Sequence, residues 1–408
     1  MRRRLSRDRV CRAMEALRAW VFVLLAVLGT GAALAAERKP FRIGFLGLDN
    51  DPRHAARETY ARLILRPAID TMAGVEIALR DAQIVGRATG FEFTLEAARV
   101  RDAAELEAAF DRLHELGVRF FVADLDSDSL TRVAGHAAGR DALFFNVSEI
   151  DDALRGARCA ANVLHIVPSR SMLTDALAQF LAHKNWRAVL LLHGPLAEDA
   201  ALAAAYEASL AKFGVKVVEK RDFVSGNDPR AREKNDVQLL TTGVNYDTVL
   251  VVDTLGEFAR YVPYDTVLPR PVVGSVGLVP SAWHWASERF GSPQLNSRFE
   301  RHVGRLRRMQ DPEFAAWAAI RSLLEAVMRT KSDDFAALRQ ALLSPDMRFD
   351  LYKGVPASFR SWDHQMRQPI VLHTDDAVIA YAPLPEFLHA RNHLDTLGVD
   401  EPMSACRF

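Results

Sequence analysis

The fold is indicated first by residues 119–147, which read RFFVADLDSDSLTRVAGHAAGRDALFFNV. The apolar runs at 119–123 and 143–147 predict two buried strands, and the residues between them predict a short helix over 129–138. Two strands joined through a helix normally lie parallel in one sheet, with the helix packed across one face. This stretch therefore predicts an α/β fold with parallel strands.

The same alternation continues on both sides of this unit. Before it, the pattern predicts strands at 41–48 and 91–100 and helices at 67–81 and 103–116. After it, the pattern predicts helices at 171–183, 197–213 and 231–241 and strands at 188–192, 215–218, 248–252 and 272–275. We therefore predict two doubly wound parallel-sheet lobes of similar size.

The last third of the chain departs from this alternation. It predicts helices at 312–329 and 335–343, followed by extended segments at 359–362, 368–373 and 377–381. Extended segments after a long helix do not continue a series of strands and crossover helices. They are typical of chain that passes back between two lobes.

The first 35 residues are typical of a cleaved signal peptide. Arg12 and Arg18 precede an apolar run at 19–30, and Ala33 and Ala35 have the A-x-A spacing of a cleavage site. The run is shorter than the roughly 20 apolar residues of a membrane span, so an uncleaved anchor is only the alternative. Met14 is a second candidate start of translation. We expect the mature chain to be exported.

Removal of residues 1–35 changes the charge balance. The remaining 373 residues contain 45 Lys and Arg and 50 Asp and Glu, a net charge near −5. Nucleic-acid-binding proteins carry a basic surplus, so this class is not expected. The length exceeds what one hydrophobic core usually supports, which favours two domains.

The three cysteines also divide at the predicted cleavage point. Cys11 falls within the signal peptide, whereas Cys159 and Cys406 remain in the exported chain. An even number of cysteines in an oxidising compartment favours a disulfide between them. Two unpaired thiols are the alternative.

No motif for nucleotide, metal or covalent chemistry is complete. The sequence contains neither the phosphate-binding G-x-x-x-x-G-K-[ST] loop nor the dinucleotide-binding G-x-G-x-x-G turn. His389 and His393 have helical spacing but lack the glutamate of a zinc motif, and the carboxylates at 124–128 lack the remaining ligands of a calcium loop. We therefore predict no cofactor, no metal site and no enzymatic activity.

Polar residues follow several predicted strands, where open α/β sheets bind their ligands. Asp124 is favoured as a site residue, and Asp128 is favoured over Asp126 as the cap of the following helix, although Asp126 is also kept as a site candidate. Trp283 is a candidate aromatic wall of a cleft, with packing between lobes as the alternative. The other candidate ligand-binding residues are Asp49, Asn146, Ser148, His193, Asp253 and Ser275.

Several segments resemble one family. They are CAANVLHIVPSRSM at 159–172, GLVPSAWH at 277–284, FRSWD at 359–363, RQPI at 367–370, and the stretch from 387 to 398. With the signal peptide and the two α/β units, the mature chain resembles the type I periplasmic binding proteins of the branched-chain amino-acid class. The segments are similar to a subgroup associated with dehydrogenase systems that depend on pyrroloquinoline quinone (PQQ) and oxidise alcohols.

The resemblance implies a fold, a mechanism and partners. It implies a first lobe at 41–163 plus 280–352 and a second lobe with a return segment at 164–279 plus 353–408. Three crossing segments, near 162–168, 277–282 and 351–359, would form the hinge on which the lobes close over a ligand. The implied location is the periplasm, and the implied partners are an ABC permease with its ATPase and a quinoprotein dehydrogenase.

The resemblance also bears on the ligand. In amino-acid-binding members, small hydroxyl residues after the third and fourth strands hold the ligand carboxylate, and Ser148 matches one of them. Asp124 stands at the other position and would repel a carboxylate, which favours a cation, an amine or an alcohol instead. We expect a solute-binding component of a transport system linked to alcohol oxidation. A periplasmic accessory or scaffold protein for a quinoprotein dehydrogenase is the alternative.

Overall fold

The computed structural model describes residues 38–408, apart from 60–61, 225–228 and 305–306. The predicted signal peptide, residues 1–35, lies outside the described residues. Over the described ranges, no helix combines the length and the apolar character needed to cross a membrane.

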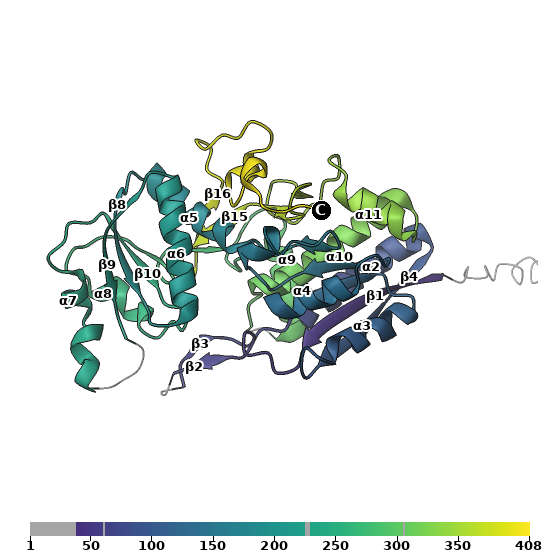
Figure 1. Ribbon diagram of the computed structural model, residues 1–408, viewed down its shortest axis with the longest axis horizontal. Helices are drawn as coiled ribbons and strands as arrows, with labels where there is room; N and C mark the ends of the chain where they lie inside the picture. Colours follow the sequence, from purple (N-terminus) through teal and green to yellow (C-terminus); the bar gives the residue numbers. More distant parts are fainter. Residues whose placement is uncertain (1–37, 60–61, 225–228, 305–306) are drawn as a thin grey trace, which may run out of the picture. The chain divides into compact units, whose positions relative to one another are not determined.

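The first large sheet has five strands in the order β4-β1-β5-β6-β7 (Figure 1). The pairs β1–β5, β5–β6 and β6–β7 are parallel, which confirms the predicted α/β fold in this half. All residues of β5 are buried, as expected for a strand covered on both faces. The strands are β1 (Lys39–Leu48), β4 (Phe91–Val100), β5 (Phe120–Asp124), β6 (Leu143–Asn146) and β7 (Val163–His165). We did not predict β7, because its three residues lie in a segment that we expected to be a crossing.

The helices of this half agree with the predictions except in α2 and α9. Helix α2 begins later and ends eight residues beyond the predicted end, since Ala82 and Val85 continue its buried face and Gly90 ends it in the left-handed region. Helix α9 was not predicted. The helices are α2 (Thr71–Thr89), α3 (Leu106–Glu115), α4 (Ser127–His136), α9 (Ser292–Val303), α10 (Asp311–Thr330) and α11 (Phe335–Leu343).

The second large sheet has four strands in the order β11-β10-β8-β9, all paired in parallel (Figure 1). The single helix predicted over 231–241 is confirmed only in its second half, as α7. A 3-10 segment ends at Asn235, and Asp236 caps a new short helix by accepting from the Leu239 amide at 3.0 Å. The elements are α5 (Arg170–His183), β8 (Ala188–His193), α6 (Ala197–Lys212), β9 (Lys216–Asp222), α7 (Val237–Thr241), β10 (Thr248–Val252), α8 (Val262–Asp265) and β11 (Val272–Gly274).

Three small antiparallel sheets hold the remaining strands of the described residues. The extended segments predicted at 368–373 and 377–381 are confirmed as β15 and β16, whereas 359–362 contributes only one strand residue, Phe359. The sheets are β12 (Val279–Ser281) with β15 (Ile370–His373) and β16 (Val378–Ala382), β13 (Ser358–Phe359) with β14 (Met366–Arg367), and the unpredicted hairpin of β2 (Arg57–Glu58) and β3 (Ile64–Arg66).

Separate buried cores lie on the two large sheets, and the chain passes between them three times. Along the chain, the buried residues belong to one core up to a certain point and to the other core after it. These changes fall between Val167 and Met172, between Leu278 and Ala282, and between Met366 and Ile370. The first two passages lie at or next to the predicted crossings. The third lies later than the predicted 351–359, because Leu351, Ala357 and Phe359 pack in the core of the first sheet. The segment 353–366, expected in the second lobe, therefore contributes to the first core.

Buried polar contacts join the passages. The Gln368 side chain donates from Nε2 to the Ile166 carbonyl at 2.6 Å and accepts from Lys353 Nζ at 2.6 Å. The Asp311 carboxylate accepts from the backbone amides of Ala282 and Trp283 at 2.8 and 2.9 Å. Each passage thus makes at least one hydrogen bond to a side chain from a distant part of the sequence.

Lys353 predicts a specific dependence of stability on pH. Its side chain is 3% exposed, and burial lowers its pKa to about 7, against the opposing effect of Asp311. In the unfolded chain a lysine keeps its proton to about pH 10.4, so between these values the unfolded state binds more protons than the folded state. The free energy of unfolding therefore rises with pH, by about 3 kcal/mol between about pH 7 and pH 9.5.

We expect Lys353→Met to remove this rise. The free energy of unfolding, measured by urea denaturation at both pH values, is expected to change with pH much less in the variant than in the unmodified protein. Lys216→Met, at an exposed position of β9, serves as the control and should keep the full pH response. The same pH response in Lys353→Met and in the unmodified protein would contradict the prediction.

Candidate functional site

The carboxyl edge of the first large sheet brings the loops after β1 and β5 together. Gly47 of β1 lies opposite Asp124 of β5 in the parallel register. The loop after β1 begins with the polar run DNDPRH at 49–54, directly beside the end of β5. Open α/β sheets bind ligands at this kind of edge, so its side chains define the candidate site.

Asp124 is the buried centre of this edge, at 6% exposure. Its Oδ1 lies 2.6 Å from His54 Nε2, and its Oδ2 accepts from the Thr71 hydroxyl at 2.5 Å. Burial alone would raise the pKa of Asp124, but hydrogen bonds from His54, Thr71 and Ser148 outweigh it and hold the pKa below the ordinary value. Asp124 is therefore a carboxylate that the structure keeps ionised.

Arg53 ties the neighbouring acidic groups together. Its guanidinium pairs with Asp51 at 2.6 Å and also lies 3.6 Å from Glu149 and 3.9 Å from Asp124. Burial lowers the pKa of Arg53, but these three carboxylates outweigh it and hold the pKa above its ordinary value. Its Nη1 donates to Ser148 Oγ at 3.4 Å. One cation is thus surrounded by three acidic side chains.

A cavity of about 330 Å³ adjoins this cluster. Asp70, one of its acidic residues, pairs with Arg99 at 3.0 Å. His54 Nδ1 is buried and has no hydrogen-bond partner among the described residues. The principal lining residues are Phe45, Leu48, Asn50, Asp51, His54, Ile69, Asp70, Thr71, Arg99 and Asp124.

The described hydroxyl groups of the cluster, those of Thr71 and Ser148, hydrogen-bond the Asp124 carboxylate. Thr71 donates its proton to Asp124 and not to the His54 ring. The arrangement is suited to binding a polar group.

The structure corrects the assignment of the helix cap. Asp126 caps α4 by accepting from the Ser129 amide at 2.8 Å, whereas Asp128 is exposed and pairs with Arg158 at 2.7 Å. The preference for Asp128 as the cap is therefore wrong. The Asp126 carboxylate is used to cap α4, and Asp126 is not among the described residues that line the cavity.

Other candidates of the first sheet lie near the cluster. Ser148 contacts Arg53, as described above. Asn146 is fully buried, and its side chain holds the following turn through Glu149 and also contacts His165 Nδ1 at 3.0 Å. Asp49 is exposed at the start of the loop after β1. Of these three, only Ser148 lies directly in the Asp124 cluster.

The candidates of the second sheet lie together at its carboxyl edge. His193 pairs with Asp222 at 2.6 Å. The Asp253 carboxylate accepts four backbone amides, those of residues 255, 256, 258 and 259, at 2.9 to 3.1 Å. Ser275 accepts from the Asp253 amide at 3.0 Å. Asp253 and Ser275 therefore shape the loop after β10.

Trp283 is not an exposed aromatic wall. It is 3% exposed, its indole donates to Asn296 at 3.0 Å, and its ring stacks on Phe314 with centroids 4.4 Å apart. The assignment of Trp283 to a ligand site is corrected to packing in the first core. In the sequence, a tryptophan among aromatic residues at this position fits an aromatic cleft wall and packing between lobes equally well.

The sequence prediction missed most of the partners of Asp124. Arg53 and His54 lie in the loop after β1, and Thr71 begins α2 after the capping residue Asp70. The polar run at 49–54 directly after the first strand was the available signal for the first two. Nothing local distinguishes Thr71 from an ordinary first residue of a helix.

The comparisons with known proteins agree with this fold. Residues 69–257 match the family model described as periplasmic binding protein. A search of curated proteins finds no match. Over residues 69–257 the sequence is similar to this family, and over most of its length the fold is similar to that of the solved structures described next.

Solved structures of similar fold cover most of the chain. An ABC transporter substrate-binding protein from Sphaerobacter thermophilus is 15% identical with a TM-score of 0.65, and the match covers 85% of this chain and 98% of that one. One from Desulfitobacterium hafniense in complex with Leu is 16% identical, with a TM-score of 0.61 and coverages of 84% and 100%. A solute-binding protein from R. palustris in complex with benzoate is 11% identical, with a TM-score of 0.61 and coverages of 90% and 100%.

Proposed function

We propose that this protein is the periplasmic solute-binding component of an ABC transport system and binds a small molecule at the carboxyl edge of its first sheet. The observation that carries the proposal is the cavity beside the buried Asp124, His54 and Thr71 cluster. The fold supports the same class, since the similar structures include ABC transporter substrate-binding proteins. We propose a binding protein and not an enzyme.

We propose a ligand that donates hydrogen bonds to the inner part of the cavity, from an alcohol or an amine. Asp124 is ionised and buried there, and His54 Nδ1 adds an unused ring nitrogen. A carboxylate placed against Asp124 would be repelled, and the low dielectric of a buried position strengthens that repulsion. Benzoate and leucine, named with the similar structures, would therefore need to place their carboxylates elsewhere.

We propose that closure occurs between two lobes, and that residues 1–35 are a signal peptide that directs the chain to the periplasm. The two sets of buried cores and the three passages between them support the lobes at 41–163 plus 280–352 and at 164–279 plus 353–408, with 353–366 reassigned to the first. The passages would act as the hinge. Asp49, Asn146, His193, Asp253 and Ser275 are proposed to support the cleft from the two sheet edges.

The finer proposal is a link to PQQ-dependent alcohol oxidation, which rests on the sequence segments quoted above. The partners would be an ABC permease with its ATPase and a quinoprotein dehydrogenase. Co-purification of the exported chain with such a dehydrogenase tests this link. A stable complex without any small-molecule ligand would instead favour the scaffold function.

Ligand binding is testable by thermal unfolding of the exported chain. In a panel of alcohols, amines, PQQ and metal ions, we expect an alcohol or amine to raise the midpoint, because a ligand at 100 times its Kd stabilises the folded state by about 2.7 kcal/mol. Asp124→Asn is expected to weaken that ligand about tenfold or more, since a hydrogen bond to a charged group is lost. The affinity is measured by calorimetry.

The control is Asp128→Asn, the same substitution four residues away on an exposed side chain. It should leave the affinity unchanged. Equal affinities of the Asp124 variant and the unmodified protein would show that the ligand does not reach this carboxylate. No midpoint shift with any compound would count against the binding function itself.

A further inference from the structure

The β2–β3 hairpin sets two arginines against each other. Arg57 and Arg66 are direct partners in its antiparallel register. Directly opposite residues project from the same face with Cβ atoms roughly 5 Å apart, and like charges in such a pair destabilise the hairpin. The hairpin is a two-stranded sheet of its own and belongs to neither large sheet (Figure 1). Its two strands are short, so little else compensates for the repulsion.

The two guanidinium groups have no carboxylate partner in the part of the chain that the structure describes. Among the described residues, no carboxylate forms an ion pair with Arg57 or Arg66, and each arginine donates a single hydrogen bond, to a backbone carbonyl. Arg66 Nη2 donates to Ala55 at 3.0 Å, while its Nε is buried and has no partner in the described part of the chain. Burial and the charge of Arg57 both lower the pKa of Arg66. A buried N–H group beside a second cation destabilises the fold unless it donates a hydrogen bond to an acceptor.

The hairpin also meets the second sheet. Arg57 Nη1 donates to the carbonyl of Thr254, in the loop that follows β10. That loop is held in place, since the Thr254 amide donates to Asp199 at 2.7 Å and the Asp253 carboxylate accepts four amides further along it. Arg57 therefore contacts a fixed loop at the carboxyl edge of the second sheet.

We propose that Arg57 and Arg66 form a binding site for an oxyanion, a carboxylate or a phosphate group. An oxyanion between the two guanidinium groups would offset their repulsion and accept a hydrogen bond from the unused Nε–H of Arg66. The planar donor fork of arginine matches the oxygen geometry of both groups. Ala55, which accepts from Arg66, lines the cavity next to Asp124. The site thus lies at the cavity, on the side of the hairpin.

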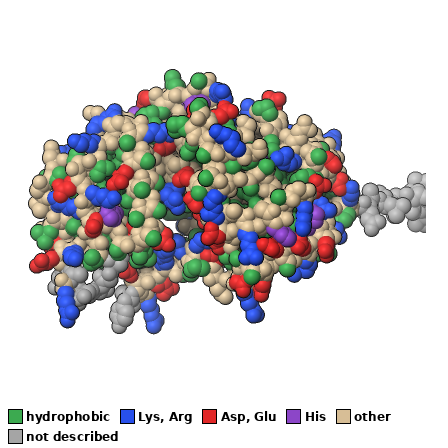
Figure 2. Space-filling view, in the orientation of Figure 1, with side chains coloured by type: hydrophobic (Ala, Val, Ile, Leu, Met, Phe, Trp, Pro, Cys, Tyr) green, Lys and Arg blue, Asp and Glu red, His purple; other side chains and the backbone are tan. Residues whose placement is uncertain are grey.

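This inference deepens the proposed function and rests on it. The inner part of the cavity carries an ionised carboxylate, and the hairpin carries two cations. A ligand that fits both ends has a hydroxyl or amino group at Asp124 and an anionic group at Arg57 and Arg66. In Figure 2, acidic and basic side chains lie close to one another around the hollow near the middle of the visible face.

The test uses the exported chain and three probes at constant ionic strength: lactate, its neutral analogue lactamide, and inorganic phosphate. Binding is measured by calorimetry for the unmodified protein, Arg57→Gln and Arg66→Gln. We expect each substitution to weaken lactate or phosphate about ten- to a hundredfold and to leave lactamide unchanged, because only the anions use the charge. Preference for lactate over phosphate identifies a carboxylate site, and the reverse identifies a phosphate site.

Arg62→Gln is the matched control, with the same charge change at an exposed position between the two strands of the hairpin. It should bind all three probes as the unmodified protein does. Thermal midpoints of the variants show whether the fold is intact. The proposal is overturned if the two arginine variants bind the anions as tightly as the unmodified protein, or if neither anion binds the unmodified protein at about 10 mM. A neutral alcohol or amine that still binds in those cases leaves the proposed function standing.

Discussion

Removal of the disulfide between Cys159 and Cys406 is expected to lower the free energy of unfolding by about 2–5 kcal/mol. The bond confirms the predicted pairing and joins residues 247 positions apart. A cross-link over so long a loop restricts the unfolded chain strongly, and this is the main source of its stabilising effect. Loss of this one bond releases a long stretch of the unfolded chain from its constraint.

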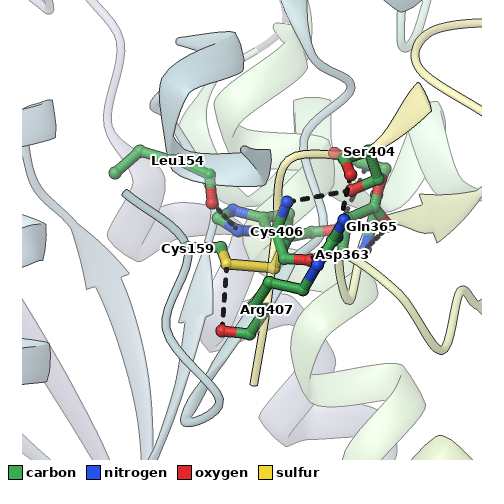
Figure 3. Close-up of a disulfide and its surroundings, with 8 residues drawn as sticks. Leu154, Cys159, Asp363, Gln365, Ser404, Cys406 and Arg407 are labelled. Atoms are coloured by element: carbon green, nitrogen blue, oxygen red, sulfur yellow. Dashed lines mark hydrogen bonds between the residues drawn. A yellow bond between two sulfur atoms is a disulfide. The ribbon is translucent and has the colours of Figure 1, made fainter. Parts of the chain in front are cut away.

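The surroundings of the bond indicate what it holds. Figure 3 shows Cys406 beside Asp363 and Gln365, with the last residues of the chain around the bond. Cys406 is 4% exposed, and the ring of Phe408 stacks on His364 with centroids 4.1 Å apart. The bond therefore fastens the end of the chain to the segment between β13 and β14 and to the loop before β7.

The measurement is urea denaturation of the double variant Cys159→Ser and Cys406→Ser, which leaves no free thiol at the site. Reductant added to the unmodified protein should give the same loss of stability and should have no effect on the variant. If the variant unfolds at the same urea concentration as the oxidised protein, the bond does not stabilise the fold, and its constraint on the unfolded chain must be offset elsewhere.

Arg360→Met is expected to lower the free energy of unfolding by about 3–5 kcal/mol, the usual effect of removing one partner of a buried ion pair. Arg360 is 1% exposed, donates to Asp395 at 3.0 Å and to the Leu397 carbonyl at 2.7 Å, and lies 3.6 Å from Asp363. Methionine fills similar space but leaves the Leu397 carbonyl and the Asp363 carboxylate without this donor. Their desolvation is then uncompensated.

An exposed arginine of the same C-terminal region provides the control. Arg391 pairs with Glu401, and its side chain is 73% exposed, so Arg391→Met should change the free energy of unfolding by less than about 1 kcal/mol. Both variants are compared by denaturation under identical conditions. A loss in Arg360→Met no larger than in Arg391→Met would mean that water reaches the buried carboxylates and replaces the guanidinium.

The alternation of strands and helices was predictable because it is local. A buried strand such as β5 or β10 is a short apolar run, and a helix such as α10 repeats its apolar positions every three to four residues. The predictions failed where the sequence signal for the observed element was weak or depended on distant residues. Asp236 interrupts an otherwise helical stretch by capping a new helix, and β7 has only three residues.

The candidate site was only partly predictable for the same reason. Asp124 stands out because it follows a buried parallel strand, a position at which such sheets bind ligands. Its partners His54 and Thr71 come from 70 and 53 residues away, so no local pattern joins them to it. Asp126 and Trp283 had the right residue types for a site, but their hydrogen bonds and packing commit them to a helix cap and to the core.

The sequence by itself determined the α/β class, the two sheets and the cysteine pair, because hydrophobic periodicity and residue counts follow from the order of residues alone. Only the tertiary structure decided which polar side chains meet, where the third passage between the cores lies, and that Arg57 opposes Arg66 in an unpredicted hairpin. The physical reason is that burial, hydrogen bonds and ion pairs depend on distances between segments far apart in the chain, and the fold alone sets those distances.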